Sequence, residues 1–476
     1  MRLSALKGDI ELMNRSHRAL VLLIAIPVIV ACTMIPEYHR PAAPVAALFP
    51  HAPRTRNDTA ATELFRRRFI AEERLNRIID LALLNNRDLR IAALNVLQTR
   101  AQYQVTRSAS FPTLDAQMSL ARQRVAGLTT SQWSASVGSA AYEVDFFGRV
   151  RSLNEQALET YFATEEGQRS AQIALVAEVA TQYFALREAQ DQRVLAQQTC
   201  SAVQESYEVS KIMFDAGANN ELDLRSAEGQ RQTAKFNLLT YERQQEEAEN
   251  ALTLLLGTTM PADLPEPRPF DATDLLADVS PGLPSDLLQR RPDILQAEHE
   301  LKAANANIGA ARAAFFPRIT LTGSVGSGSS ELSGLLGAGA GAGASASAWS
   351  FAPQLTVPIF TGGANRATLD TAVIGARIEI ANYEKAIQTA FREVADALVD
   401  IGNYAEQITV ESIAIEAQAR RLELAKARYA QGEDSYLNVL SAQEDLYTAQ
   451  QGRLQAQFNR LGAQISLYQA LGGGWK

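Results

Sequence analysis

The sequence has little of the chemistry from which catalytic and metal sites are built. Its 476 residues include four histidines and two cysteines, and none of them has the Cys/His/carboxylate spacing of a metal site. It also lacks a nucleophile elbow, a P-loop and a dinucleotide-binding fingerprint. We therefore expect no enzymatic activity, no cofactor and no metal. His299 stands between Glu298 and Glu300, and we assign it to a solvated or interface position.

The sequence also lacks an excess of positive charge, and long apolar runs are scarce. The formal net charge is −8 and no dense Lys/Arg run occurs, which argues against a nucleic-acid partner. After Cys32 there is no uninterrupted apolar stretch of the roughly 20 residues that a transmembrane helix needs. Any membrane crossing by the mature chain must therefore use β-strands.

The longest apolar run lies near the N-terminus. Residues 19–31 are uncharged, follow two arginines and end at Ile29-Val-Ala-Cys32, a pattern similar to a bacterial lipobox. We expect residues 1–31 to be a lipoprotein signal peptide, with Met13 as an alternative start, and Cys32 to carry diacylglycerol and palmitoyl chains. An ordinary cleaved signal with an incidental cysteine is the alternative. The other thiol is Cys200, so a lipidated chain forms no intramolecular disulfide.

Two parts of the chain repeat each other. Asp88 to Pro112 aligns with Asp293 to Pro317 at an offset of 205, and Phe214 to Gly217 aligns with Tyr429 to Gly432 at an offset of 215. Each half reads as a helix, a pair of alternating strands and two very long helices joined at a tip. We therefore expect an N-terminal lipid-anchored extended segment, a first repeat, an equatorial linker and a second repeat, at residues 32–70, 71–265, 266–285 and 286–476.

Proline marks the helical parts by its absence. None occurs between Pro112 and Pro261 or after Pro358, and helix interiors tolerate proline poorly. Residues 150–214 hold one glycine and no proline, which allows a helix of roughly 65 residues, on the order of 95 Å long. Apolar residues that recur every seven positions predict supercoiled helix pairs, with Cys200 in a buried seam of the first half. These residues are Ile408, Ile415, Leu422 and Tyr429, then Leu440, Tyr447, Leu454, Leu461 and Tyr468.

Both tips carry helix-capping residues. Gly217 and Gly432 are expected to end the ascending helices in a left-handed cap. Asn220 and Ser435 are expected to cap the helices that follow. Each tip is therefore predicted to be a tight helical hairpin, near residue 217 in the first half and near residue 432 in the second.

The strand pairs are predicted within 113–147 and 317–360. The return strand of the first pair lies within 133–147, and Gly323 to Ser350 includes the loop of the second pair. The clearest alternation runs from Trp349 to Ile359, with apolar residues on one face and Ser350, Ala352, Gln354 and Thr356 on the other.

Four strands are too few for a pore. They cannot close a barrel, and an open sheet edge is not tolerated in hydrocarbon. Several copies must therefore share one barrel, and three copies give twelve strands.

With these motifs the chain resembles the TolC-like outer membrane factor family, in the lipoprotein branch (similar to NodT and OprM) that serves resistance-nodulation-division efflux systems. The resemblance covers the chain from Cys32 almost to Lys476. The residues that carry it are Cys32 to Pro41, Asn85 to Arg90, Phe111-Pro112, Tyr142 to Gly148, Arg290 to Asp293, Phe316-Pro317, Val357 to Gly363 and the two tips.

The resemblance implies an α+β membrane protein. Its tandem-duplicated helical hairpins would form a trimeric periplasmic α-barrel of roughly 100 Å, below a 12-stranded outer-membrane β-barrel shared by three chains with four strands each. The protein would be the exit duct of a tripartite efflux pump in the outer membrane of a Gram-negative bacterium. Substrates would pass from periplasm to exterior without any bond being made or broken. The expected partners are two further copies of the chain, a periplasmic adaptor (membrane fusion) protein, an inner-membrane resistance-nodulation-division pump and outer-membrane lipid.

The resemblance also implies a gate at the periplasmic tips. The matching gate residues are Tyr429, Asp434, Leu437, Asn438 and Ser441. The tip residues expected to contact the adaptor are Gly217, Ala218, Asn219, Asn220, Leu222, Gly432, Glu433 and Ser435. Relatives commonly carry Asp where this chain has Ser441, so we expect weaker cation selectivity, with Glu433, Asp434 and Asp445 as the remaining acidic candidates.

Two other functions stay open from the sequence. The same channel would also serve type I protein secretion. A periplasmic lipoprotein that acts as a coiled-coil scaffold or adaptor would share the lipobox and the long heptad helices, although the alternating strands argue against it.

Overall fold

The chain folds into two compact units whose segments alternate along the sequence. The computed structural model describes residues 33–46, 49, 70, 72–270, 273, 275, 288, 290–332, 335 and 346–473. The sheet unit comprises the described parts of Met1–Pro41, Val96–Thr164 and Gln296–Tyr383, and the hairpin unit those of Ala42–Asn95, Glu165–Leu295 and Glu384–Lys476. The expected signal peptide, Cys32 and most of the expected linker at 266–285 lie outside the described residues.

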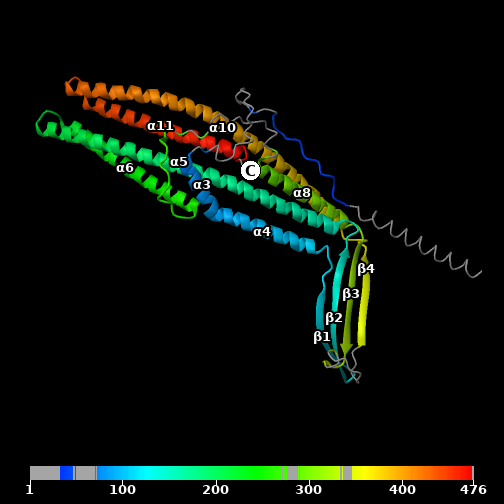
Figure 1. The fold of residues 1–476 in the computed structure, drawn as a ribbon. Coiled ribbons are helices and arrows are strands. Elements are labelled where there is room, and N and C mark those ends of the chain that lie inside the picture. Colours follow the sequence, from blue (N-terminus) through cyan, green and yellow to red (C-terminus); the bar gives the residue numbers. More distant parts are fainter. Residues whose placement is uncertain are drawn as a thin grey trace, which may run out of the picture. The chain divides into compact units, whose positions relative to one another are not determined.

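The sheet unit contains one four-stranded antiparallel sheet in the order β1-β2-β3-β4 (Figure 1). Its strands are β1 (Asp115–Val125), β2 (Leu128–Val144), β3 (Arg318–Ser329) and β4 (Ala346–Thr356). Strands β2 and β3 come from different halves of the chain and pair with Val137 opposite Val325. The two predicted hairpins are therefore joined into a single sheet, with β1 and β4 at its edges.

Two strand boundaries differ from the prediction. Strand β2 begins at Leu128, earlier than expected, because Ala126 and Gly127 adopt positive φ angles of 50° and 84° and reverse the chain in two residues. Strand β4 ends at Thr356, so the predicted alternation does not continue to Ile359. Strand β3 ends at Ser329 and β4 begins at Ala346, both within the segment from Gly323 to Ser350 that was expected to include their connection.

Each half continues into two long helices. Helices α5 (Arg149–Asp215) and α10 (Ala364–Ala430) have 67 residues each, about 100 Å at 1.5 Å per residue. Helices α6 (Glu221–Leu256) and α11 (Tyr436–Ala470) return from the tips. The hairpins and their lengths confirm the prediction. The remaining helices are α3 (Glu73–Asn85), α4 (Arg87–Ser108) and α8 (Pro292–Ala313).

Membrane-spanning helices are not found in the described part of the chain, where every helix is too short or too polar to cross a bilayer.

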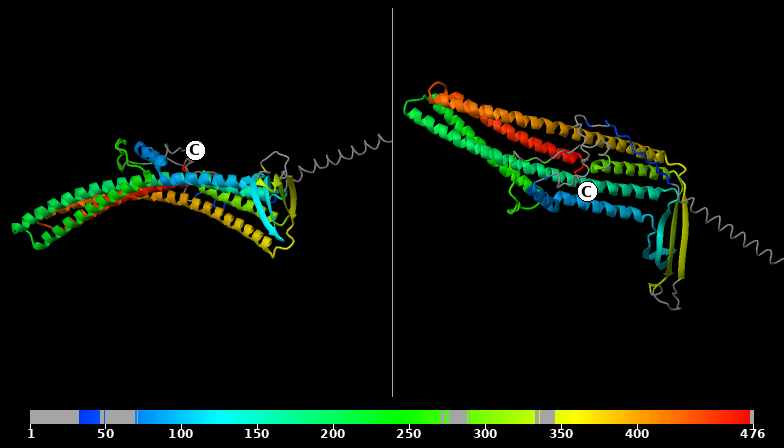
Figure 2. Two further views of the ribbon diagram at one scale, coloured as in Figure 1. Left: turned by 90° about the horizontal axis from the view of Figure 1, so that it is seen from below. Right: turned by 45° about the horizontal axis from the view of Figure 1, so that its top comes forward.

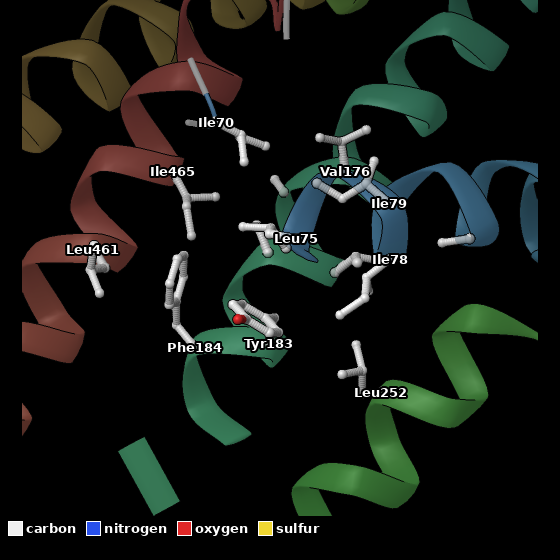
Figure 3. Packing of buried hydrophobic residues seen from close by; sticks show 14 of the residues in the cluster. Ile70, Leu75, Ile78, Ile79, Val176, Tyr183, Phe184, Leu252, Leu461 and Ile465 are labelled. Atoms are coloured by element: carbon white, nitrogen blue, oxygen red, sulfur yellow. The ribbon is translucent and has the colours of Figure 1, made fainter. Parts of the chain in front are cut away.

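The core of the hairpin unit lies where α3 packs against the long helices (Figure 3). Helix α3 contributes Leu75, Ile78 and Ile79, which are fully buried against Tyr183 and Leu252. The Tyr183 hydroxyl donates to Glu72 Oε1 at 2.5 Å, which gives the one polar group of this ring a partner. From the segment after α6, Phe270 and Leu275 join the same core. Part of the expected linker at 266–285 is therefore core.

The seven-residue period is confirmed more fully in the second half than in the first. Tyr447, Leu461 and Tyr468 are buried on α11. On α5, Cys200 is only half-buried and Phe214 is 37% exposed. The expectation of a buried Cys200 is therefore wrong for the single chain, because α5 exposes part of that seam.

Candidate functional site

The two tip turns have the same backbone geometry and lie side by side in the hairpin unit (Figure 2). Gly217 has φ 70° and Gly432 has φ 73°. The N–H of Ala218 donates to the carbonyl of Met213 at 2.8 Å, and the N–H of Glu433 donates to that of Arg428 at 3.0 Å. These six-to-one bonds end α5 and α10 as left-handed caps, as predicted.

The helices that follow the tips are capped by the predicted side chains. Asn220 Oδ1 accepts from the N–H of Asp223 at 2.9 Å, and Ser435 Oγ accepts from the N–H of Leu437 at 3.2 Å. Asn219 Nδ2 donates to Ser210 Oγ at 3.1 Å and so ties the first turn back to α5. Each reversal is therefore held by hydrogen bonds within its own hairpin.

Aromatic residues join the two hairpins just behind their tips. The rings of Tyr429 and Tyr436 lie 5.1 Å apart within the second hairpin, and the Tyr429 hydroxyl donates to Met213 Sδ on α5 of the first hairpin at 3.8 Å. Burial and then the charge of Asp223 raise the pKa of Tyr429. Tyr436 is buried with Ala227 of the other hairpin. A movement of one tip relative to the other therefore has to break this packing.

The remaining predicted tip residues are solvent-accessible in the single chain. Leu222 is 66% exposed and Leu437 is 50% exposed. Asn219, Tyr429 and Asp434 are partly buried, whereas the other predicted tip and gate residues are exposed: Gly217, Ala218, Asn220, Gly432, Glu433, Ser435, Asn438 and Ser441. These residues are therefore free to contact a partner or a further copy.

Two of the three acidic candidates are paired with arginines. Asp434 accepts from Asn438 at 2.5 Å and from the N–H of Ser435 at 2.8 Å, and lies 3.4 Å from Arg428. These contacts, Asn438 first, lower the pKa of Asp434. Asp434 is therefore ionised but balanced by a nearby cation.

Asp445 is balanced in the same way, by an arginine that the sequence reasoning missed. Arg421 on α10 forms an ion pair with Asp445 and donates to Ser441 Oγ at 3.3 Å, both on α11. In a helical hairpin that reverses at Gly432, residues 421 and 445 lie at similar distances from the turn, on facing helices. Ser441 is thus hydrogen-bonded to a guanidinium.

The sheet has one apolar and one polar face, as predicted from the alternation. Apolar side chains that share a face are exposed on every strand, with Met118 56%, Val137 48%, Val325 64% and Trp349 80% exposed. On the other face, serine hydroxyls pair between strands, as in Ser324 and Ser350 at 2.8 Å. An exposed apolar face of this extent indicates contact with lipid or a partner.

The segment after Cys32 is docked along α8. We call residues 33–40 the N-terminal strap. Its Met34 and Pro36 carbonyls accept from Arg312 at 3.3 Å and Asn305 at 2.8 Å. Its Arg40 pairs with Glu298, which is 4% exposed. The strap thus runs antiparallel to α8.

No cluster of metal-binding side chains is found among the described residues. Nδ1 of His299 lies 2.5 Å from Glu159 Oε2, and its ring packs against Phe162 with centroids 5.5 Å apart. His299 therefore has a packing role, at an interface between helices.

The chain matches known proteins along most of its length. The family model of the outer membrane efflux protein matches residues 78–258 and 283–473. The solvent efflux pump outer membrane protein SrpC of Pseudomonas putida is 46% identical over 456 residues, which cover 93% of this chain and 96% of that protein. The outer membrane protein OprJ of Pseudomonas aeruginosa is 42% identical over 453 residues, covering 94% and 93%.

Solved structures are similar over the same extent. The open state of the MtrE outer membrane channel of Neisseria gonorrhoeae is 40% identical, with a TM-score of 0.85, and the match covers 94% of this chain and 99% of that one. CusC, whose structures concern folding and transmembrane channel formation, is 37% identical with a TM-score of 0.81 and coverage of 93% and 100%.

Proposed function

The chain belongs to the outer membrane efflux protein family, and we propose that its copies form the outer-membrane exit duct of a tripartite efflux pump. The amphipathic sheet carries this proposal. Among the described residues, edge strands β1 and β4 each pair on one side only, and unpaired backbone groups are costly in a membrane. Edge-to-edge pairing between copies removes this cost, and three copies place twelve strands around a lumen with the apolar face toward lipid.

The hairpins supply the periplasmic part of the duct. Helices of 67 residues reach about 100 Å from the sheet's connections, and the paired tips form the gate at their far end. A periplasmic adaptor, bound to an inner-membrane pump of the resistance-nodulation-division class, opens the duct by engaging the exposed tip residues. The relatives named as efflux pump proteins favour this role over type I secretion or a scaffold.

Lipid on Cys32 anchors the chain in the same membrane. The docked strap supports this, because Cys32 lies two residues before Met34, which is bonded to the last turn of α8 shortly before β3 begins. Metabolic labelling with a palmitate analogue should mark the wild type and not Cys32→Ala. Equal labelling of the two proteins would contradict lipidation at Cys32.

The duct is tested by purification from the outer-membrane fraction and reconstitution. We expect a trimer by native mass spectrometry, ion-conducting pores in planar bilayers, and increased sensitivity to toxic small molecules in a deletion strain. A monomer without conductance would contradict the channel. A conducting trimer whose deletion abolishes protein export but leaves small-molecule sensitivity unchanged would favour type I secretion.

A further inference from the structure

Apart from Asp115, the charged residues on the polar face of the sheet lie at one end. The register places Glu143 beside Thr320 and Arg318 beside Thr356 on this face. Towards the far end, every strand carries hydroxyl, amide, glycine or apolar residues there, apart from Asp115 at the start of β1. Asp115 pairs with Gly138, which lies opposite Ser324, four residues along β3 from the partner of Glu143 and so about 13 Å away.

The charges at this end form a triad with a net charge of +1. Glu143 accepts from Arg149 at 2.8 and 2.6 Å, and Arg318 Nε lies 2.7 Å from Glu143 Oε2. The carboxylate is 10% exposed, whereas the Arg318 side chain is 56% exposed. The adjacent pair of Asp145 and Arg151 is neutral. The guanidinium of Arg318 is therefore exposed to water, whereas the carboxylate of Glu143 is shielded from it.

We propose that Arg318, held in place by Glu143 and Arg149, is a specificity-determining residue that forms a cationic collar at the end of the sheet nearest the helices. This proposal rests on the proposed duct, in which the polar face lines the lumen. At the collar anionic solutes are concentrated and cations are depleted, whereas the serine- and threonine-lined face above it passes solutes without regard to charge.

The collar is tested by reversal potentials of wild-type and Arg318→Gln channels in a KCl gradient of about 10 to 100 mM, where the screening length is about 10–30 Å. Arg318→Gln should raise the cation-to-anion permeability ratio about four-fold, because one unit charge about 10 Å away in water changes the local concentrations of cations and anions about two-fold each and in opposite senses. The change should disappear near 1 M salt, where the screening length is about 3 Å.

Two variants serve as controls. Arg318→Lys keeps the charge and should keep the wild-type ratio. Arg122→Gln removes the same charge from the opposite, apolar face of β1 and should leave the ratio unchanged. A conducting Arg318→Gln channel with the wild-type ratio at low salt, or an equal effect of Arg122→Gln, would overturn the collar. A wild type without conductance would instead refute the duct itself, and the collar with it.

Discussion

Asn86 holds Leu255 in the first half of the chain in the way that Arg291 holds Ala470 in the second. Asn86 Nδ2 donates to the Leu255 carbonyl at 2.9 Å, and Arg291 Nη1 donates to the Ala470 carbonyl at 3.0 Å. The donors are 205 residues apart and the acceptors 215, the two offsets of the sequence repeat. The duplication thus preserves a contact even where an amide is replaced by a guanidinium, because both can serve the open carbonyls at a helix end.

Asn86→Ala should destabilise the hairpin unit by about 1–2 kcal/mol, because Asn86 also caps α4 by accepting from the N–H of Leu89 at 2.9 Å. Thermal unfolding followed by circular dichroism measures the loss. Arg87→Ala, at the exposed neighbouring position, is the matched control and should change little. Equal melting temperatures for Asn86→Ala and the wild type would show that the contact is dispensable.

Gly257→Ala should cost about 2–4 kcal/mol. Gly257 has φ 65°, and a Cβ atom there would lie 2.5 Å from the carbonyl oxygen of Asn85. Gly402→Ala is the control, because a Cβ at this helical position meets no atom within 4 Å, and it should stabilise by about 0.5–1 kcal/mol. The same melting experiment reports both changes, and a loss of stability in Gly402→Ala as large as that in Gly257→Ala would contradict the steric account.

Ser441→Asp should raise cation selectivity of the reconstituted channel. The new carboxylate adds negative charge at the tip, and it competes with Asp445 for Arg421. Ser441→Asn, which keeps the size and neutrality, is the matched control. Reversal potentials measure the cation selectivity of each channel. Identical ion selectivity of Ser441→Asp and the wild type would count against a gate at this position.

Arg421→Gln should raise cation selectivity without any new carboxylate, since it leaves Asp445 unbalanced. Arg420→Gln changes the net charge equally but removes only a bond to Glu423 on the same helix, at 2.5 Å, and is the control. A larger shift in Arg420→Gln than in Arg421→Gln would refute the account in which Arg421 balances the charge of Asp445.

The N-terminal strap should detach from α8 at low pH. Burial alone would raise the pKa of Glu298, but the bond from Arg40 and the charge of Lys302 outweigh it and hold that pKa below the ordinary glutamate value. A lowered carboxyl pKa stabilises the docked strap above the unfolded pKa of about 4.3, and this stabilisation is lost as the pH falls through the lower, folded value. Limited proteolysis with an acid-active protease between about pH 6 and 2 measures the release.

Glu298→Gln should loosen the strap at neutral pH and remove most of this pH dependence, since it leaves Arg40 without its charged partner. Glu300→Gln, at an exposed position on the same helix, should behave as the wild type. Unchanged protection of the strap in Glu298→Gln would show that the backbone bonds to Asn305 and Arg312 suffice.

Much of the fold follows from local patterns. Missing prolines and the period of seven predict the long helices, and Gly217 and Gly432 predict their tips because a left-handed cap depends on a few adjacent residues. The start of β2 was missed because Ala126 and Gly127 carry a weak turn signal, and the end of β4 because apolar alternation continues past the last paired residue. The exposure of Cys200 depends on what covers α5, which a periodic pattern does not specify.

By itself the sequence determined the repeat, the lengths of the hairpins, the two faces of the strands and the family. Only the tertiary structure decided which charges meet: Arg421 with Asp445, Glu143 with Arg149 and Arg318, and Arg40 with Glu298. Helical and strand periods are properties of neighbouring residues, so they can be read along the chain. The partner of a charge in another element depends on the register in which elements pack, and register is set by the sum of many contacts.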